Sequence, residues 1–393
     1  MDNRKHPSLV INSFNVLILI LIISLYFIIA EDDKDIEFTE SYEDYGVVTT
    51  VQFHSTTPEV NITDPEFSLI KLKKYNRYIF ASYITCSGLG NQMYRISALY
   101  GIGLHLNRTP GFDANKKCQR KYTNEYLMTF PNVMKLIGFH DLNNSEVTHS
   151  DFGSHCCKYD DPEMQVTSVT ILRSYKYFHS VKDHIRELFD FHPKIKDTVE
   201  AYGKKLFTVD SDSHKMCIHI RRGDFIRYGM LETRADFLLP AMTTVRDFVS
   251  KKYSGKKISL IFFTTDWKFV NSLNFTKSDY FKIYHPELSN RAENMYFGIR
   301  FCDSILLSAS GSTFGFWIAY LMPERSPVFY NGQIENVRGG GKYLLDYIDY
   351  DKFPKDWNML ELNRKTNTVT IDNRWFFEKF GLRTVNDVNA IHI

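Results

Sequence analysis

The segment HIRRGD, His219–Asp224, combines residue types that can bind a diphosphate. Its first two residues end the apolar run MCIHI, and ligands of open α/β sheets bind beyond the carboxyl ends of strands. An arginine fork donates two hydrogen bonds to phosphate oxygens and stays charged. Alternation along a strand predicts that His219 and Arg221 face the ligand together while Arg222 points away. Asp224 is then expected to pair with Arg222 or to orient His219; a purely structural arginine–aspartate pair is the alternative.

A glycine loop, GLGNQM, stands between a predicted strand and a predicted helix. Gly88 and Gly90 let the backbone approach a ligand closely, and the free N–H groups of a helix start attract an anion. Asn91 is either a ligand contact or a helix cap, and capping is the more common role for such a loop. The loop lacks the GxGxxG pattern, so a nicotinamide or flavin fold is not supported.

Two more strand ends carry polar residues. In SASGSTFGFW, Ser312 and Thr313 stand at an expected helix start, which is a phosphate-binding geometry or a simple cap. In FFTTD, Asp266 ends an apolar run. Its carboxylate could accept hydrogen bonds from guanine or ribose, and a turn-forming aspartate is the alternative.

These segments require strands that alternate with helices, which predicts an α/β class with parallel sheets. Two such blocks fit, before and after about residue 210, with the DSDSH stretch as a hinge, and residues 333–393 receive no assignment. The expected strands are Tyr78–Thr85, Val166–Leu172, Lys215–Ile220, Ile258–Thr264, Ser304–Ser308 and Val328–Tyr330; helices are expected from Met93 to Leu104, at Ala292–Phe301 and at Thr313–Leu321.

The N-terminus predicts a membrane anchor. Residues 9–30 carry no charge, and at about 1.5 Å per residue they can cross a hydrocarbon core of roughly 30 Å. Arg4 and Lys5 precede this stretch and three acids follow it, so the positive-inside rule places the body in the lumen. Cleavage as a signal peptide after Ala30 is the alternative; we favour the anchor because the apolar stretch exceeds a usual signal core. Eight acids in residues 31–45 then begin a solvated stem.

Secretory features agree with this topology. Four N-x-S/T sequons are candidate glycosylation sites: Asn61, Asn107, Asn143 and Asn274. Of the six cysteines, Cys217 and Cys302 lie in apolar segments and are expected to be buried free thiols, whereas Cys118 with Cys156 or Cys157 is the better candidate for a disulfide. No cysteine–histidine spacing suggests zinc. A net charge of +2 without a basic run argues against nucleic acid as a partner.

Taken together, and in this order, the segments resemble the alpha-1,2-fucosyltransferase family. SGLGNQM looks like its G-x-L-G-N-Q-M loop, HIRRGDF like its central H-x-R-R-G-D element, and FCDSILLSASGSTFGFWIAYL like its C-terminal strand and helix. Ser87 replaces the usual first glycine of the loop, Phe316 a usual tryptophan and Tyr94 a common phenylalanine. The resemblance covers about Thr85 to Asn331.

The resemblance implies a GT-B-like architecture of two Rossmann-type domains with a donor cleft between them. It also implies GDP-fucose as donor, no metal or other cofactor, and a glycan acceptor on a glycoprotein or glycolipid. The expected activity is inverting transfer to the 2-hydroxyl of galactose by a type II Golgi membrane protein. The boundaries are 1–8 for the cytosolic tail, 9–30 for the anchor, 31–76 for the stem, 77–210 for the N-terminal domain, and 211–393 for the C-terminal GDP-sugar-binding domain and tail.

The expected catalytic residues are Arg221, His219, Asn91 and Asp224. Arg221 would stabilise charge on the β-phosphate, and His219 or Asp224 would be the base if one is needed. Donor contacts are expected from Gly88, Gly90, Asn91, His219, Arg221, Asp266, Ser312 and Thr313. Alternative functions are use of another GDP-sugar, protein O-fucosylation, or a catalytically silent, anchored lectin-like protein, because fold alone does not fix function.

Overall fold

The structure is a computed structural model that describes residues 72–81, 88–115, 117–141, 148–151, 163–167, 172, 174–228, 230–334 and 352–374. All of them belong to one unit of the chain, Thr63–Ile393. The predicted anchor at 9–30 and nearly all of the predicted stem lie outside the described residues. Within the described ranges, no helix combines the length and the apolar character needed to span a membrane.

The first sheet has five strands in the order β3-β2-β1-β5-β4, and every neighbouring pair is parallel. Parallel strands need helical crossovers, as the alternating pattern predicts. The strands are β1 (Tyr78–Ala81), β2 (Thr109–Asp113), β3 (Gly138–His140), β4 (Thr148–Asp151) and β5 (Glu163–Thr167); the helices of this half are α2 (Leu89–Leu106), α3 (Lys117–Thr129), α4 (Pro131–Leu136) and α6 (Lys182–Leu188), with 3-10 turns at Tyr175–Tyr177 and His179–Val181.

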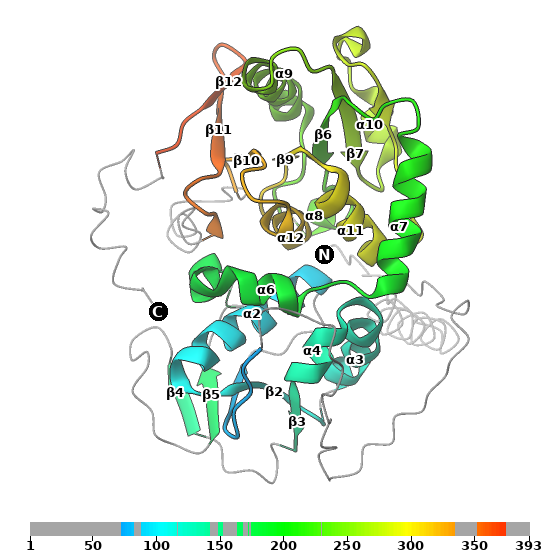
Figure 1. The fold of residues 1–393 in the computed structure, drawn as a ribbon. Helices are drawn as coiled ribbons and strands as arrows, with labels where there is room; N and C mark the ends of the chain where they lie inside the picture. Colours follow the sequence, from blue (N-terminus) through cyan, green and yellow to red (C-terminus); the bar gives the residue numbers. More distant parts are fainter. Residues whose placement is uncertain are drawn as a thin grey trace, which may run out of the picture. The chain divides into compact units, whose positions relative to one another are not determined.

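The second sheet has seven strands in the order β12-β11-β10-β9-β6-β7-β8, and only β12 is antiparallel (Figure 1). The strands are β6 (His214–His219), β7 (Ile258–Phe263), β8 (Ile283–Tyr284), β9 (Ser304–Leu307), β10 (Val328–Asn331), β11 (Asn358–Asn363) and β12 (Thr368–Ile371). The helices are α7 (Pro193–Leu206), α8 (Asp224–Arg227), α9 (Ala235–Lys252), α10 (Trp267–Ser272), α11 (Arg291–Phe301) and α12 (Thr313–Leu321), with a 3-10 turn at Lys277–Asp279.

Helices cover both faces of this second sheet. Met216 and Ile218 of β6 pack in one apolar cluster with buried residues of α9. Cys217, on the opposite face of β6, belongs to a second cluster that includes α11 and α12. Strands buried on both faces are nearly continuous apolar runs, which is why ISLIFF and MCIHI were recognisable as strands.

The predicted α/β class with parallel sheets is confirmed. The helix predicted at Thr313–Leu321 has those bounds, and α11 and β7 differ from their predictions by one residue at one end. The strand expected at Val166–Leu172 is β5, which lies earlier, at Glu163–Thr167. The unassigned tail contributes β11 and β12. The boundary at residue 210 and a GT-B cleft remain predictions.

In the DSDSH stretch, Asp210, Ser213 and His214 are buried, whereas Ser211 and Asp212 are exposed, and its role as a hinge stays a prediction. The Asp210 carboxylate accepts hydrogen bonds from Ser259 Oγ at 2.6 Å and from the Tyr284 hydroxyl at 2.9 Å, and Lys215 Nζ lies 3.4 Å from its other oxygen. Burial opposes the charge, but hydrogen bonds from Ser213, Ser259 and Tyr284 and the Lys215 ammonium keep the pKa of Asp210 below its usual value.

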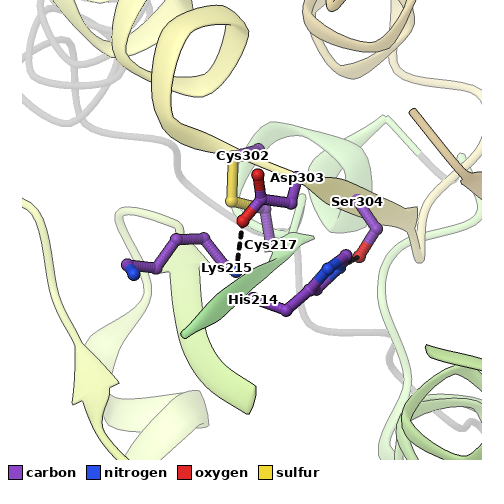
Figure 2. The surroundings of a disulfide bond; sticks show 6 residues. All are labelled: His214, Lys215, Cys217, Cys302, Asp303 and Ser304. Atoms are coloured by element: carbon purple, nitrogen blue, oxygen red, sulfur yellow. Dashed lines mark hydrogen bonds between the residues drawn. A yellow bond between two sulfur atoms is a disulfide. The ribbon is translucent and has the colours of Figure 1, made fainter. Parts of the chain in front are cut away.

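A disulfide joins Cys217 and Cys302, so the prediction of two free thiols is wrong (Figure 2). Both residues are buried as expected, and their Cα atoms are 5.7 Å apart. The bond connects the centre of β6 with the residue that follows α11 and precedes β9. Beside it, the backbone N–H of Lys215 donates to Asp303 Oδ2 at 2.7 Å. The other predicted disulfide, from Cys118 to Cys156 or Cys157, depends on side chains outside the described ones.

Candidate active site

The carboxyl ends of three neighbouring strands position the site. In register, His219 at the end of β6 lies opposite Phe263 of β7 on one side and Leu307 of β9 on the other. The three strands therefore end together, and the RRGD, TTD and SASGST segments leave the sheet side by side. This is the edge at which parallel α/β sheets bind ligands.

The loop after β9 is held by hydrogen bonds from its serines. Ser308 Oγ donates to the carbonyl of His219 at 2.7 Å, and Ser310 Oγ donates to the carbonyl of Asn331 at 2.7 Å. Ser312 caps α12, since its Oγ accepts from the Gly315 N–H at 3.5 Å, and Thr313 begins the helix partly exposed. The loop is therefore fixed to both neighbouring strands, and its end presents a helix N-terminus.

Gly90 in the first turn of α2 lies directly against this helix start. Trp317 Nε1 donates to the Gly90 carbonyl at 2.8 Å. A Cβ added at Gly90 would lie 2.7 Å from Thr313 Oγ1 and 2.8 Å from the Phe314 nitrogen. Only glycine permits this approach. Gly88, by contrast, is the N-cap of α2, is exposed, and would have nothing within 4 Å of an added Cβ.

Asn91 does not cap α2. Gly88 occupies the N-cap and α2 has no side-chain cap, while Asn91 Oδ1 is buried without a hydrogen-bond partner. A buried, unpaired amide oxygen is costly and is usually explained by a ligand, water or ion. The geometry thus excludes the helix cap for this residue, and the ligand contact stays a prediction.

His219 is buried and uncharged at neutral pH. Burial, and then the nearby charge of Arg221, lower the pKa of His219 to about 3. Its Nδ1 has no hydrogen-bond partner and would lie 2.8 Å from a Cβ placed on Gly315 in the first turn of α12. The neutral ring is therefore a weak base packed against this helix start, and its contact with a donor stays a prediction.

The two arginines have different surroundings. Arg221 Nη2 donates to Asp224 Oδ2 at 2.6 Å, its Nε is buried without a partner, and 41% of its side chain is exposed. Arg222 Nε donates to Asp266 Oδ2 at 3.0 Å, and its Nη1 donates to the Thr233 carbonyl at 2.7 Å. Arg222 is thus fixed within the protein, as expected of a scaffold residue, whereas Arg221 keeps donor capacity.

The expected partners of Asp224 were wrong. Its carboxylate pairs with Arg221, not with Arg222 or His219. The alternation used to place these side chains stops at His219, where β6 ends, so it does not extend to Arg221. Asp266 caps α10 through Oδ1, which accepts from the Phe269 N–H at 3.0 Å, and its Oδ2 accepts from Arg222. Both oxygens of Asp266 therefore have protein partners, and donor binding by it stays a prediction.

The separate motifs converge on the first turn of α12 and the loop that precedes it. Gly90 touches Thr313, and His219 faces Gly315. A Cβ on Gly311 would lie 3.5 Å from the ring of Phe225, and the Arg221 guanidinium lies 5.5 Å from the centre of that ring. Sequence reasoning did not single out Phe225, Gly311 or Gly315. The second glycine of the SASGSTFGFW stretch, Gly315, was the available signal, because a glycine inside a helix often marks a close packing contact.

The remaining predicted sites are only partly described. Asn107 and Asn274 are exposed, and Asn107 ends α2 with a left-handed φ of 54°; Asn61 and Asn143 lie outside the described residues. Use of any sequon stays a prediction. Among the described residues, no three His, Cys, Asp or Glu side chains converge as a metal site requires, and the expectation of a metal-free enzyme likewise stays a prediction.

Comparison with known proteins gives one family. The model of "Glycosyl transferase family 11" matches residues 88–331, which includes every segment of the site. A Caenorhabditis elegans protein named galactoside 2-alpha-L-fucosyltransferase is 29% identical over 309 residues, covering 75% of this chain and 83% of that protein. Another worm protein of the same name is 27% identical over 316 residues, covering 71% of this chain and 76% of that protein.

Solved structures give a weaker likeness. NodZ alpha-1,6-fucosyltransferase soaked with GDP-fucose aligns with a TM-score of 0.43 and 11% identity, over 75% of this chain and 99% of that one. POFUT1 in complex with GDP-fucose aligns with a TM-score of 0.40 and 11% identity, over 66% of this chain and 98% of that one.

Proposed function

The chain belongs to glycosyl transferase family 11, and on this basis we propose that it transfers L-fucose from GDP-fucose to the 2-hydroxyl of galactose on a glycan. The names of its worm relatives support both the sugar and the acceptor hydroxyl. The chemistry of the site independently supports a donor with a negatively charged leaving group, because its available donors are an arginine and a helix N-terminus.

One observation carries the proposal. Among the buried polar atoms without hydrogen-bond partners in the described part of the chain are Asn91 Oδ1, His219 Nδ1 and Arg221 Nε. The segments of Asn91 and His219 meet at the first turn of α12, and Arg221 lies near the loop that precedes this helix. Native proteins rarely leave such atoms unpaired, and a cluster of them at the carboxyl edge of a parallel sheet is the pattern of a ligand site.

In the proposed reaction, the C1–O bond of GDP-fucose breaks and GDP takes the bonding electrons. Negative charge then grows on the β-phosphate, and Arg221 would stabilise it together with the N-terminal N–H groups of α12 near Thr313. Preorganised donors of this kind lower a barrier by about 3–4 kcal/mol each. Arg222 contributes by holding the chain after β6 against α10 through Asp266.

The acceptor hydroxyl forms the new bond to C1 from the face opposite GDP, so that a β-linked donor gives an α-fucoside. We assign no strong base to this step. His219 is a weak base with a pKa of about 3, and the Asp224 carboxylate is paired with Arg221. These surroundings favour a route in which GDP leaves well before the acceptor loses its proton, and the proton then passes to water or to a β-phosphate oxygen of the departing GDP. Asn91 Oδ1 would accept a hydrogen bond from donor or acceptor.

The proposal includes no required metal, because Arg221 supplies the positive charge at the leaving group. Initial rates with excess EDTA check this point, and inhibition that Mg²⁺ or Mn²⁺ restores would contradict it.

The proposal also places the protein in the Golgi membrane as a type II protein anchored by residues 9–30. Only the sequence supports this placement. Resistance of the full chain to alkaline extraction, with the body protected from protease in sealed vesicles, is the expected result. Release by alkali would contradict the anchor.

The direct test uses the full chain in detergent with GDP-fucose and glycans that end in β-galactose. Mass spectrometry should show one added deoxyhexose, and a 2-specific α-fucosidase should remove it. Addition of a different sugar from another GDP-sugar would overturn the proposed donor. An added fucose that resists this fucosidase would overturn the proposed linkage to the 2-hydroxyl.

A further inference from the structure

An exposed apolar strip follows directly after the RRGD segment. Ile226, Tyr228 and Met230 expose 49%, 68% and 37% of their surface. They make up three of the seven exposed large hydrophobic side chains in the described part of the chain. Single exposed apolar residues are ordinary, but a group of them beside polar residues usually marks a contact surface.

The backbone that carries the strip is well fixed. Phe225, just before it, is buried, and the Met230 N–H donates to the Phe225 carbonyl at 2.9 Å. The Tyr228 N–H donates to the Asp224 carbonyl at 2.8 Å. The exposed side chains therefore extend from a folded turn, so their exposure is a property of the native state.

The strip adjoins the proposed donor site through one short helix. Asp224, the first residue of α8, accepts the hydrogen bond from Arg221, and Tyr228 ends the same helix. The Arg227 guanidinium lies 5.1 Å from the centre of the Tyr228 ring. An exposed aromatic ring with a cationic fork over one of its faces thus lies within one helical turn of the pair that contains Arg221.

We propose that Tyr228 and Arg227 bind the terminal sugar of the acceptor glycan. A pyranose has a face of C–H groups that packs on an aromatic ring, and its hydroxyls accept hydrogen bonds from a planar guanidinium. A sugar is the occupant that fits, because the surface combines an apolar ring with donors, as small-molecule sites do, and adjoins the atoms that bind the donor. This inference rests on the proposed function and identifies where its acceptor binds.

The test compares Tyr228→Ala, Tyr228→Phe and Phe281→Ala in the full chain. Phe281 is a matched control, since it is another exposed aromatic residue of the same half, 39% exposed. Tyr228→Ala should raise the KM for lactose on the order of tenfold while the KM for GDP-fucose stays within twofold. Tyr228→Phe keeps the ring and should raise the KM for lactose less than about threefold.

An unchanged KM for lactose in Tyr228→Ala, or an equal rise in both KM values, would overturn the inference and leave the proposed function intact. If the native chain transfers no fucose, saturation-transfer NMR with methyl β-D-galactoside replaces kinetics. Binding to the native chain that Tyr228→Ala abolishes and Phe281→Ala preserves would support the sugar site without the proposed reaction. If the galactoside does not bind to the native chain, the sugar site is rejected. If the native chain is a dimer that Tyr228→Ala dissociates, the strip is an interface between copies and the sugar site is also rejected.

Discussion

Replacement of Gly90 by alanine tests the contact between α2 and α12 that assembles the site. The new Cβ would lie 2.7–2.8 Å from Thr313 and Phe314 atoms, two of which are backbone atoms of the helix start. Ordinary contact begins near 3.4 Å, so α12 must retreat by about 0.6–0.7 Å. Such overpacking destabilises a protein by about 1–3 kcal/mol. A misplacement approaching 1 Å in a catalytic site lowers the rate by as much as ~100-fold.

The assay is thermal unfolding of Gly90→Ala beside Gly88→Ala, together with initial rates of fucose transfer. Gly88 is the stability control because its φ of −58° suits alanine and nothing lies within 4 Å of an added Cβ. Its replacement should change stability by less than about 1 kcal/mol. Gly90→Ala should lower Tm by several degrees and reduce kcat at least tenfold. Equal Tm values for the two variants would refute the tight contact.

Two other perturbations have defined outcomes. A Cys217→Ala/Cys302→Ala variant loses a cross-link between residues 85 positions apart and should lower Tm by about 10 °C, measured without reductant; an unchanged Tm would show that the bond adds no stability. His219 has a pKa of about 3 in the folded protein and 6.5 ordinarily, so the folded state binds fewer protons than the unfolded state. Its contribution to the free energy of unfolding is therefore fully present above pH 6.5 and is lost as the pH falls toward 3. Urea unfolding at pH 7 and pH 5 should show that the native chain loses about 2 kcal/mol more than His219→Gln; equal losses would contradict a buried neutral ring.

Much of the second sheet could be predicted because its strands are buried on both faces. ISLIFF and MCIHI are apolar at nearly every position, and α12 begins at a serine cap and ends before a proline. The strands of residues 333–393 were harder to predict. β11 and β12 form a hairpin whose turn, Arg364–Asn367, ends in a left-handed asparagine, but NMLELN is only half apolar because β11 is not buried along its whole length.

Pairings between distant segments could not be predicted. Cys217 and Cys302 were rightly placed in buried segments, yet their bond depends on β6 and β9 being neighbours, which a single sequence does not reveal. The partner of Asp224 was missed for a related reason. Strand periodicity does not hold past His219, because the chain there turns into α8 through Gly223 at a φ of 41°. The residue types of the site were therefore predictable, and their mutual contacts were not.

In the proposed reaction, Arg221 neutralises the departing diphosphate while Arg222 supports the strand end. Initial rates of fucose transfer from GDP-fucose by the native chain, Arg221→Ala and Arg222→Ala test it most directly. Arg221→Ala should lower kcat by about 10²–10³-fold with little change in Tm, because its side chain is 41% exposed. Arg222→Ala, which loses contacts to Asp266, Thr233 and Phe269, should lower Tm more and kcat by less than about tenfold. Equal, mild losses of kcat in both variants would contradict the assignment.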